Sequence, residues 1–460
     1  MKTQKNAEPV NRRDFLRGSS LASLMAMMGA VEIRAEDQKP EAGTEEKKLV
    51  GPPVNCAVIG SGFQGREILA SLGRLPNAPV IGVCDKYKPS LNRGIKVAPK
   101  AQPFEDYRKV LDTKEVQAVI VATPTHQHRE IVEAALSAGK HVYCEAPIAH
   151  TIEDARAIAK AAKAAIKQNF QAGLQLRSDA QRHYILAQFV RNGATGKFIK
   201  ARSQWNKKVT WRTLASTPER EKEVNWRLSN ETASGLVGEI GIHQIDATSW
   251  FFGERPNAVS GFGSLMFHRD GREVPDTIEV VVEYPGGGLL TFGSTLGSSF
   301  DSQYDVLHGS DSSILMRGIK GWLFKEVDSP LLGWEVYAKK ELVNRETGIV
   351  LRADATKLQA RDGADEGAEE VISPTQTPLH FSLESFIENC SIVKNGVTDF
   401  TDSYGEKAEG LREYIVGLDK SKLPAASYKE GFEAAVTVIK ANESILQRKR
   451  IALQDEWFQI

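Results

Sequence analysis

Short apolar runs alternate with helical stretches between residues 54 and 168. The runs VNCAVIG, PVIGVCD, VQAVIVATP and HVYCEAP each have the length of one buried strand, and stretches such as REIVEAALSAGK separate them. Thr151 precedes the alanine-rich EDARAIAKAAKAAIKQ, and together with Asp154 in this stretch it predicts a capping box at the start of a helix. Strands that alternate with helices in this way predict a parallel sheet in an α/β domain.

The pattern changes after about residue 178, where longer loops separate strand-like runs. Within them, EYPGGGLLTF predicts a hairpin across a glycine turn. Residues 354–370 are polar and charged and predict a solvated loop or insert, and two closing helical stretches, 380–393 and 428–450, are expected to pack back on the domains. The strand-like runs are KFIKARSQW, AVSGFGSLMF, TIEVVVEYPGGGLLTFGSTL and SSILMRGIKGWLFKEV.

The N-terminus has the pattern of a targeting signal. NRRDFLRGSS (11–20) carries two arginines followed by Phe and Leu, and LASLMAMMGAV then supplies a short apolar region. This pattern resembles a twin-arginine export signal, with Asn11 where Ser or Thr is more usual. It predicts a signal peptide over 1–35, a disordered linker over 36–52, and a periplasmic or otherwise extracytoplasmic protein. A membrane anchor is the weaker alternative, because the apolar run is short.

Charge and cysteine content narrow the class of protein. Lys plus Arg and Asp plus Glu both number 59, with no large basic block, so nucleic acid is not an expected partner. No apolar run after residue 50 approaches the ~20 residues of a membrane span, so no stable insertion after export is expected. No metal-ligand spacing occurs, and no metal is predicted. The absence of a disulfide framework fits a chain that folds in the cytoplasm before export. The four cysteines are Cys56, Cys84, Cys144 and Cys390.

A glycine turn follows the first predicted strand. Gly60, Gly62 and Gly65 have the spacing G-x-G-x-x-G, and Asp85 ends the next apolar run about 20 residues further on. The glycines permit a tight turn, close approach of a pyrophosphate and close packing of helix on strand, while the carboxylate accepts from ribose hydroxyls. The combination predicts a nicotinamide dinucleotide site; a glycine turn without ligand is the alternative.

Residues near the glycine turn indicate which coenzyme binds, and the predicted export indicates how tightly it is held. Phe63 and Gln64 lie inside the glycine motif and are expected to contact the coenzyme. Asp85 favours NAD, while Lys86 and Arg93 leave NADP open. Because free dinucleotide is expected to be scarce beyond the membrane, we expect an exported protein to hold its coenzyme tightly.

Several polar side chains follow predicted strands at their carboxyl ends, where ligands of such sheets bind. Thr123, Pro124, His126 and His128 follow one strand, and Glu145 ends another. We expect Thr123, Pro124, His128 and Glu145 to contact coenzyme or substrate. The alternatives are a helix-entry histidine at His128 and a surface carboxylate at Glu145.

The stretch EIGIHQID (239–246) contains a histidine and two carboxylates. On a helix, Glu239, His243 and Asp246 fall at i, i+4 and i+7 and share one face. A carboxylate one turn before a histidine can hold one ring nitrogen and leave the other free to move a proton. A capped helix entrance with a satisfied histidine is the alternative.

Together these motifs resemble the glucose-fructose oxidoreductase and inositol dehydrogenase (Gfo/Idh/MocA) family over nearly the whole chain after the signal. The resemblance implies an NAD(P)-binding Rossmann domain (53–178), then an α/β substrate domain with an open, mostly antiparallel sheet and closing helices (179–460). It also implies oxidoreduction of a sugar, cyclitol or related carbohydrate. The motifs are GSGFQG with Asp85, ATPTHQH, AGKHVYCEAPIA, QLR (175–177) and SGLVGEIGIHQIDATSWFFG (234–253).

In the family, the histidine that His243 matches works beside the nicotinamide, with an acidic residue one turn earlier. Here Glu239 replaces the usual Asp. The chain also departs at Ala146, where the family usually has a lysine assigned to coenzyme anchoring and proton transfer. Lys207 and Lys208 are candidates to replace it, although solvated charge is their simpler interpretation.

The expected partner is a small carbohydrate, with Arg177 and Trp226 as candidate contacts; tryptophans can equally be core residues. A homo-oligomer is left open. Because Ala146 replaces the lysine, two alternatives to a plain dehydrogenase stand. One is a glycoside-cleaving enzyme that oxidises its sugar transiently, and the other is a non-enzymatic sugar-binding protein that retains the fold.

Overall fold

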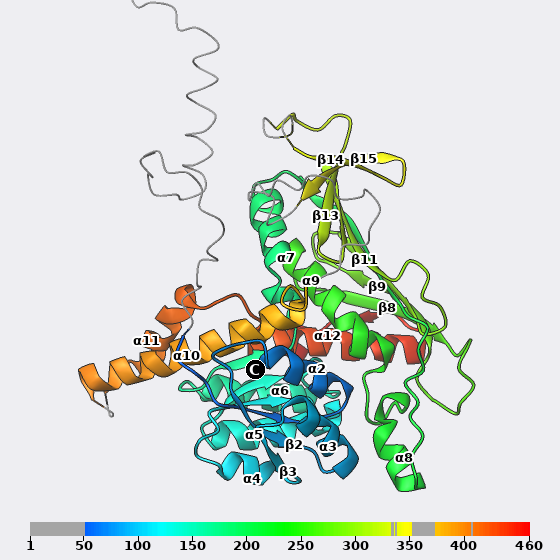
Figure 1. Ribbon diagram of the computed structural model, residues 1–460. Helices are drawn as coiled ribbons and strands as arrows, with labels where there is room; N and C mark the ends of the chain where they lie inside the picture. The colour runs from blue at the N-terminus through cyan, green and yellow to red at the C-terminus, as the bar shows by residue number, and fades with distance from the viewer. Residues whose placement is uncertain (1–50, 333–334, 336–337, 352–372, 406–407) are drawn as a thin grey trace, which may run out of the picture. The chain divides into compact units, whose positions relative to one another are not determined.

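The computed structural model describes residues 51–332, 335, 338–351, 373–405 and 408–460 (Figure 1). The predicted export signal, nearly all of the predicted linker and the predicted insert at 354–370 lie outside these residues. Within the described residues, no helix combines the length and apolarity that crossing a membrane requires.

The first sheet is parallel and has the strand order β3-β2-β1-β4-β5-β6. Every residue of β1, β4 and β5 is buried, as expected for a sheet covered on both faces. The predicted Rossmann arrangement is therefore confirmed. The strands are β1 (Cys56–Ile59), β2 (Val80–Cys84), β3 (Gln102–Phe104), β4 (Ala118–Val121), β5 (His141–Cys144) and β6 (Phe170–Ala172).

Five helices connect these strands. At the start of α6, the Thr151 hydroxyl accepts a hydrogen bond from the Asp154 N–H, as a helix cap does. Cys56, Cys84 and Cys144 lie in buried strands as predicted, and all four cysteines are free thiols. The helices are α2 (Phe63–Leu72), α3 (Lys88–Val97), α4 (Tyr107–Asp112), α5 (His128–Ser137) and α6 (Ile152–Ala164).

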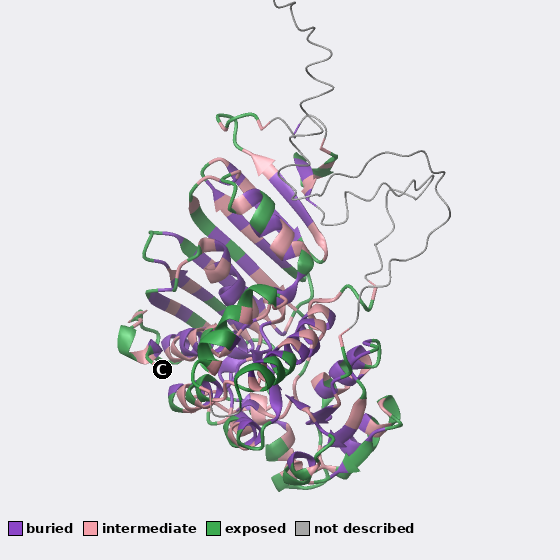
Figure 2. Cartoon of the chain, turned by 90° about the vertical axis from the view of Figure 1, so that its left-hand side faces the viewer, coloured by how far each residue is buried: buried purple, intermediate pink, exposed green. Residues whose placement is uncertain are grey.

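The second sheet has ten strands in the order β14-β15-β13-β12-β11-β7-β10-β9-β8-β16. Only the β7–β10 pair is parallel, which confirms the mostly antiparallel sheet. Buried residues alternate with more exposed ones along β9 and β10, so one face is covered (Figure 2). The strands are β7 (Phe198–Asn206), β8 (Ala258–Ser264), β9 (Thr277–Glu283), β10 (Leu289–Thr295), β11 (Gln303–Gly309), β12 (Ser312–Arg317), β13 (Lys320–Lys325), β14 (Lys340–Val343), β15 (Glu346–Leu351) and β16 (Ile451–Ala452).

The predicted hairpin is present between β9 and β10. The Tyr284 N–H donates to the Gly288 carbonyl at 3.0 Å, and Gly287 has a φ of 86°, a conformation that glycine adopts without strain. Strands β11, β14 and β15 were not predicted. Of these, β11 (QYDVLHG) carries an acid and a histidine, so its sequence lacks a clear strand pattern, and its pairing with β7 and β12 defines it.

Two long helices pack against the first domain. Helix α12 (Tyr428–Gln447) contacts both α6 and β8, and one apolar cluster runs from the first sheet through α12 to the second. Helix α10 (Pro378–Tyr404) packs on α2, where Phe386 and Cys390 share a buried cluster with Val58 of β1. Helix α10, which comes after β15 in the chain, therefore completes the core of the first sheet.

Shorter helices carry most of the candidate site residues of the second half. They are α7 (Ala180–Ile185), a π-helical turn (Leu186–Val190), α8 (Pro218–Val224), the 3-10 turn Trp226–Leu228, a π-helical turn (Val237–Gly241), α9 (Ile242–Phe252) and α11 (Leu411–Gly417).

Candidate functional site

The glycine turn has the geometry of a dinucleotide cradle. Gly60 has a φ of 96°, and a Cβ there would lie 2.6 Å from the Ala122 backbone. A Cβ at Gly65 would lie 1.9 Å from the Gly60 carbonyl oxygen, so both positions exclude larger residues. A Cβ at Gly62 would meet nothing within 4 Å, which leaves the backbone at the start of α2 open to a ligand. These positions fit the pyrophosphate of a dinucleotide.

Asp85 follows β2 and is held beside this turn. Its Oδ2 accepts from the Ser61 N–H at 3.0 Å and the Ser61 hydroxyl at 3.2 Å, and its Oδ1 accepts from the Tyr87 N–H at 2.8 Å. A carboxylate fixed at this edge is suited to accept from ribose hydroxyls.

A cleft of about 950 Å³ runs along the turn and Asp85. Its first wall is formed by the Rossmann domain and includes Gly60, Gly62, Phe63, Gln64, Asp85, Thr123 and Pro124. Its second wall is formed by residues 211–227 of the other half, including Trp211, Trp226 and Arg227. We call residues 207–228 the cleft segment. The two walls belong to different domains, which is where small-molecule sites commonly lie.

Arg227 organises the inner end of the cleft. Its guanidinium lies 4.6 Å from the ring centre of Trp226, and its Nε donates to Glu239 Oε2 at 3.2 Å. The Thr125 hydroxyl donates to the other oxygen of Glu239 at 3.4 Å. Burial raises the pKa of Glu239, and the charge of Arg227 opposes that rise.

His243 lies four residues after Glu239, but the predicted contact between them is not formed. The chain forms a π-helical turn at Val237–Gly241, which widens the spacing that an α-helix would give, and Glu239 bonds Arg227 and Thr125 instead. Among the described residues, His243 has no hydrogen-bond partner and lines neither of the two main cavities. Burial lowers its pKa to about 4, so the ring is neutral at pH 7 and able to accept a proton.

Arg177 and Asp246 form an ion pair away from the main cleft. Arg177 donates from Nε and Nη2 to the two oxygens of Asp246 at 2.8 and 2.9 Å. Both residues line a second cavity of about 250 Å³ beside Trp250. Each charge is thus paired with the other and neither residue lines the main cleft, so the roles expected for Arg177 and Asp246 stay predictions.

His128 and Glu145 lie behind the cleft rather than in its walls. The His128 ring is buried, with Nδ1 3.2 Å from the Ile148 carbonyl and Nε2 3.0 Å from the Thr123 carbonyl, so it supports the Thr123 loop. Glu145 accepts from the Gln64 side chain at 3.0 Å, and burial raises its pKa to about 7. Both residues therefore position groups that line the cleft, and their direct contact with a ligand stays a prediction.

The candidate replacements for the missing lysine do not reach the cleft. Lys208 lies with its Nζ 5.1 Å from the ring centre of Phe267, and both Lys207 and Lys208 are exposed. The family usually carries a lysine at the position of Ala146. The ionisable side chain next to this position is the buried carboxyl group of Glu145.

Sequence reasoning missed the contacts at the outer end of the cleft. Lys86 and Glu223 form an ion pair at 3.0 Å, and the Arg220 guanidinium lies 3.9 Å from the ring centre of Tyr87. These partners are more than 130 residues apart, and no local pattern signals them.

Comparisons with known proteins agree with this geometry. Residues 54–173 match the family described as "Oxidoreductase family, NAD-binding Rossmann fold", and residues 185–322 match the "GFO/IDH/MocA C-terminal domain". Levoglucosan dehydrogenase of Pseudarthrobacter phenanthrenivorans is 26% identical over 300 residues, which cover 57% of this chain and 73% of the relative. The 2,7-anhydro-N-acetylneuraminate hydratase of Escherichia coli is 27% identical over 266 residues, covering 57% and 67%.

The fold is also shared with solved structures. Levoglucosan dehydrogenase in complex with NADH and L-sorbose superposes with a TM-score of 0.64 at 17% identity, covering 88% of this chain and 99% of that chain. Both halves of the chain, the dinucleotide cradle and the mostly antiparallel sheet thus have their counterparts in one group of proteins. The chain belongs to the Gfo/Idh/MocA family of NAD-binding oxidoreductases.

Proposed function

We propose that this oxidoreductase moves a hydride between a nicotinamide dinucleotide and a hydroxyl-bearing carbon of a sugar, cyclitol or related carbohydrate. The observation that carries the proposal is the continuity of the cleft, which runs from the glycine cradle and Asp85 to Trp226 and Arg227. Levoglucosan dehydrogenase, a relative named for a carbohydrate substrate, supports the substrate class.

The chain's own residues would hold the coenzyme at the first wall. The backbone at Gly62 would face the pyrophosphate, and Asp85 would accept from the adenosine ribose. Phe63, which is 72% exposed, leaves a large apolar face free for contact with the coenzyme. When bound, the coenzyme supplies the hydride acceptor or donor.

The proton of the reacting hydroxyl would pass to a ring nitrogen of His243. The ring is neutral at pH 7 because burial lowers its pKa to about 4, and neither nitrogen has a protein partner among the described residues. Glu239 would act through Arg227, which it holds at the cleft wall. Trp226 and Arg227 would then contact the carbohydrate by stacking and by hydrogen bonding.

The deciding experiment is a screen of sugars and cyclitols with the purified protein and coenzyme. We expect the reduced-nicotinamide absorbance band to grow with at least one carbohydrate. A protein that binds the coenzyme but neither oxidises nor reduces any carbohydrate would contradict the proposal.

Export and tight retention of the coenzyme complete the proposal. The paired Arg12 and Arg13 support export by the twin-arginine route, which carries folded proteins. The cleft segment supports retention, because it adds a second wall to the coenzyme site. We expect intact-complex mass spectrometry of freshly purified protein to detect bound dinucleotide. Consistently empty protein, together with activity that depends on added coenzyme, would contradict retention.

A second candidate function is cleavage of a glycoside through transient oxidation of the sugar. Two observations favour it: Ala146 stands where the family usually has lysine, and one relative is a hydratase rather than a dehydrogenase. In this reaction the hydride returns to the sugar, so no net reduced coenzyme forms. Cleavage of a glycoside without added coenzyme, with solvent deuterium entering the sugar, would favour this candidate; stoichiometric NADH formation would exclude it as the main activity.

A further inference from the structure

The outer end of the cleft brings four charged residues together from two domains. Lys86 follows β2, and its Nζ lies 3.0 Å from Glu223 Oε1 on α8. Arg220, one turn earlier on α8, donates to Glu223 Oε2 at 2.7 Å and stacks on the ring of Tyr87. Asp85 lies at the same end of the cleft, and all these residues line it.

Glu223 binds two of the cations at this end of the cleft, Lys86 and Arg220. Hydrogen bonds from Lys86 and then from Arg220 hold the pKa of Glu223 below its ordinary value, so it is an anion at neutral pH. A further cation of this end, Arg93, donates to the Ser90 hydroxyl at 3.2 Å. Glu223 therefore occupies both Lys86 and Arg220, and Asp85 adds a second carboxylate to this end of the cleft.

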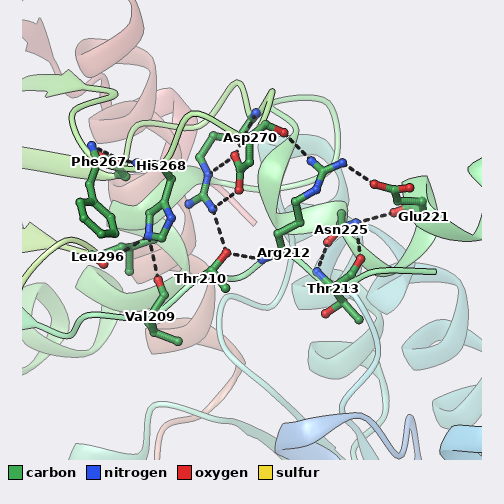
Figure 3. A network of polar contacts seen from close by, with 12 residues as sticks. Val209, Thr210, Arg212, Thr213, Glu221, Asn225, Phe267, His268, Asp270 and Leu296 are labelled. Atoms are coloured by element: carbon green, nitrogen blue, oxygen red, sulfur yellow. Dashed lines mark hydrogen bonds and ion pairs between the residues drawn. The ribbon is translucent and has the colours of Figure 1, made fainter.

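The position of α8 is fixed by the cleft segment itself (Figure 3). The Asn225 amide donates to the Thr213 carbonyl at 2.9 Å and accepts from the Thr213 N–H at 2.7 Å. Arg212 binds the Asp270 carbonyl at 2.6 Å and the Glu221 carboxylate. These bonds tie the chain before α8 to the last turn of the helix and to the loop before β9. Glu223 is therefore held in a defined place at the cleft.

We infer that Glu223 is a coenzyme-specificity residue contributed by the second domain. A phosphate on the adenosine ribose, as in NADP, would have to compete with Glu223 for Lys86 and Arg220, and it would meet the negative charge of Asp85. NAD lacks that phosphate, so its binding neither requires these cations nor brings a phosphate close to Asp85. This inference rests on the proposed binding of the coenzyme in the cleft.

The test compares Glu223→Gln with Glu219→Gln, which removes the same charge from an exposed position on the same helix. Dissociation constants for NADH and NADPH are measured by titration, in competition where coenzyme copurifies. We expect Glu223→Gln to tighten NADPH by roughly three- to tenfold, from an added interaction of one partly screened charge pair, and to change NADH less than about twofold. Glu219→Gln should change neither.

A second variant assigns the effect to the freed cation. In the Glu223→Gln background, Lys86→Met should remove most of the gain in NADPH affinity, since the lysine would be the group that binds the phosphate. An unchanged ratio of NADPH to NADH affinity in Glu223→Gln, or an equal change in Glu219→Gln, would overturn the inference while leaving the proposed function intact. Failure of the unmodified protein to bind either coenzyme would overturn both.

Discussion

The two ends of the cleft use the same kind of interaction in different surroundings. At the outer end, Lys86 and Glu223 are 59% and 48% exposed in their side chains. At the inner end, Arg227 is 43% exposed but Glu239 is only 3% exposed. Water and salt screen the first pair, so it can bias which coenzyme binds while adding little to stability. The second pair gives a buried carboxyl group its cation, and Arg227 opposes the rise in pKa that burial causes, so its loss should affect both stability and chemistry.

The largest effect is expected for His243→Ala, one turn of chain beyond Glu239. A positioned general base contributes about 10² to 10⁴ in rate, so turnover should fall by that factor while coenzyme affinity is kept. His308→Ala is the matched control, because His308 is also partly buried and bonds only Ser313 on β12 among the described residues. Steady-state kinetics and thermal unfolding of both variants give the answer; near-normal turnover in His243→Ala would contradict the assigned role.

Arg227→Met should separate the inner pair from the outer one. The methionine keeps apolar contact with Trp226 but leaves Glu239 buried without its cation, which should lower the free energy of unfolding by about 2 to 3 kcal/mol at neutral pH. Because the pKa of Glu239 would rise further, the deficit should grow as pH rises and shrink in acid. Denaturant unfolding at pH 5 and pH 8 measures this. If the unpaired carboxyl group is the cause, adding Glu239→Gln to Arg227→Met should recover part of the lost unfolding free energy. No recovery in the double variant would contradict this explanation.

Glu145→Gln tests the buried carboxyl group behind the cleft. Burial raises the pKa of Glu145 from 4.5 to about 7, so in this interval the folded protein holds a proton that the unfolded chain has lost. The contribution of Glu145 to stability should therefore fall as pH rises from about 4.5 to 7. We expect the difference in unfolding free energy between Glu145→Gln and the unmodified protein to change by roughly 2 kcal/mol between pH 5 and pH 8, without added coenzyme. A difference that is the same at both pH values would contradict the raised pKa.

The smallest effect is expected for Lys86→Met at the outer end. Loss of an exposed ion pair should change the free energy of unfolding by less than about 0.5 kcal/mol. Denaturant unfolding at low and high salt checks this value. A loss comparable with that of Arg227→Met would remove the distinction between the two ends.

The sequence predicted the first wall of the cleft well because its signals are local. Apolar runs of strand length and the spacing of Gly60, Gly62 and Gly65 each lie within a few residues, and Asp85 follows at a fixed distance. The same reasoning brought Thr123 and Pro124 to the correct edge of the sheet. It did not show which way each side chain turns, so His128 was expected in the cleft although its ring binds the backbone behind it.

The second wall was less predictable because its contacts are distant in sequence or depend on irregular helix geometry. The spacing of Glu239 and His243 indicated a shared α-helical face, but the π-helical turn at Val237–Gly241 gives Glu239 other partners. Glu223 lies 137 residues from Lys86, and α8 has no buried residue whose periodicity would mark it. Such placements follow from tertiary packing rather than local pattern.

The central claim is that the cleft from Asp85 to Arg227 holds a nicotinamide dinucleotide along its length, with the nicotinamide end turned toward His243. A crystal structure of the protein with bound NAD tests it most directly. We predict the adenosine ribose on Asp85, the pyrophosphate against Gly62, and the nicotinamide ring within about 7 Å of the His243 ring, which leaves room for one carbon and its hydroxyl between them. A nicotinamide ring that points away from His243, or an adenosine ribose without contact to Asp85, would contradict the account.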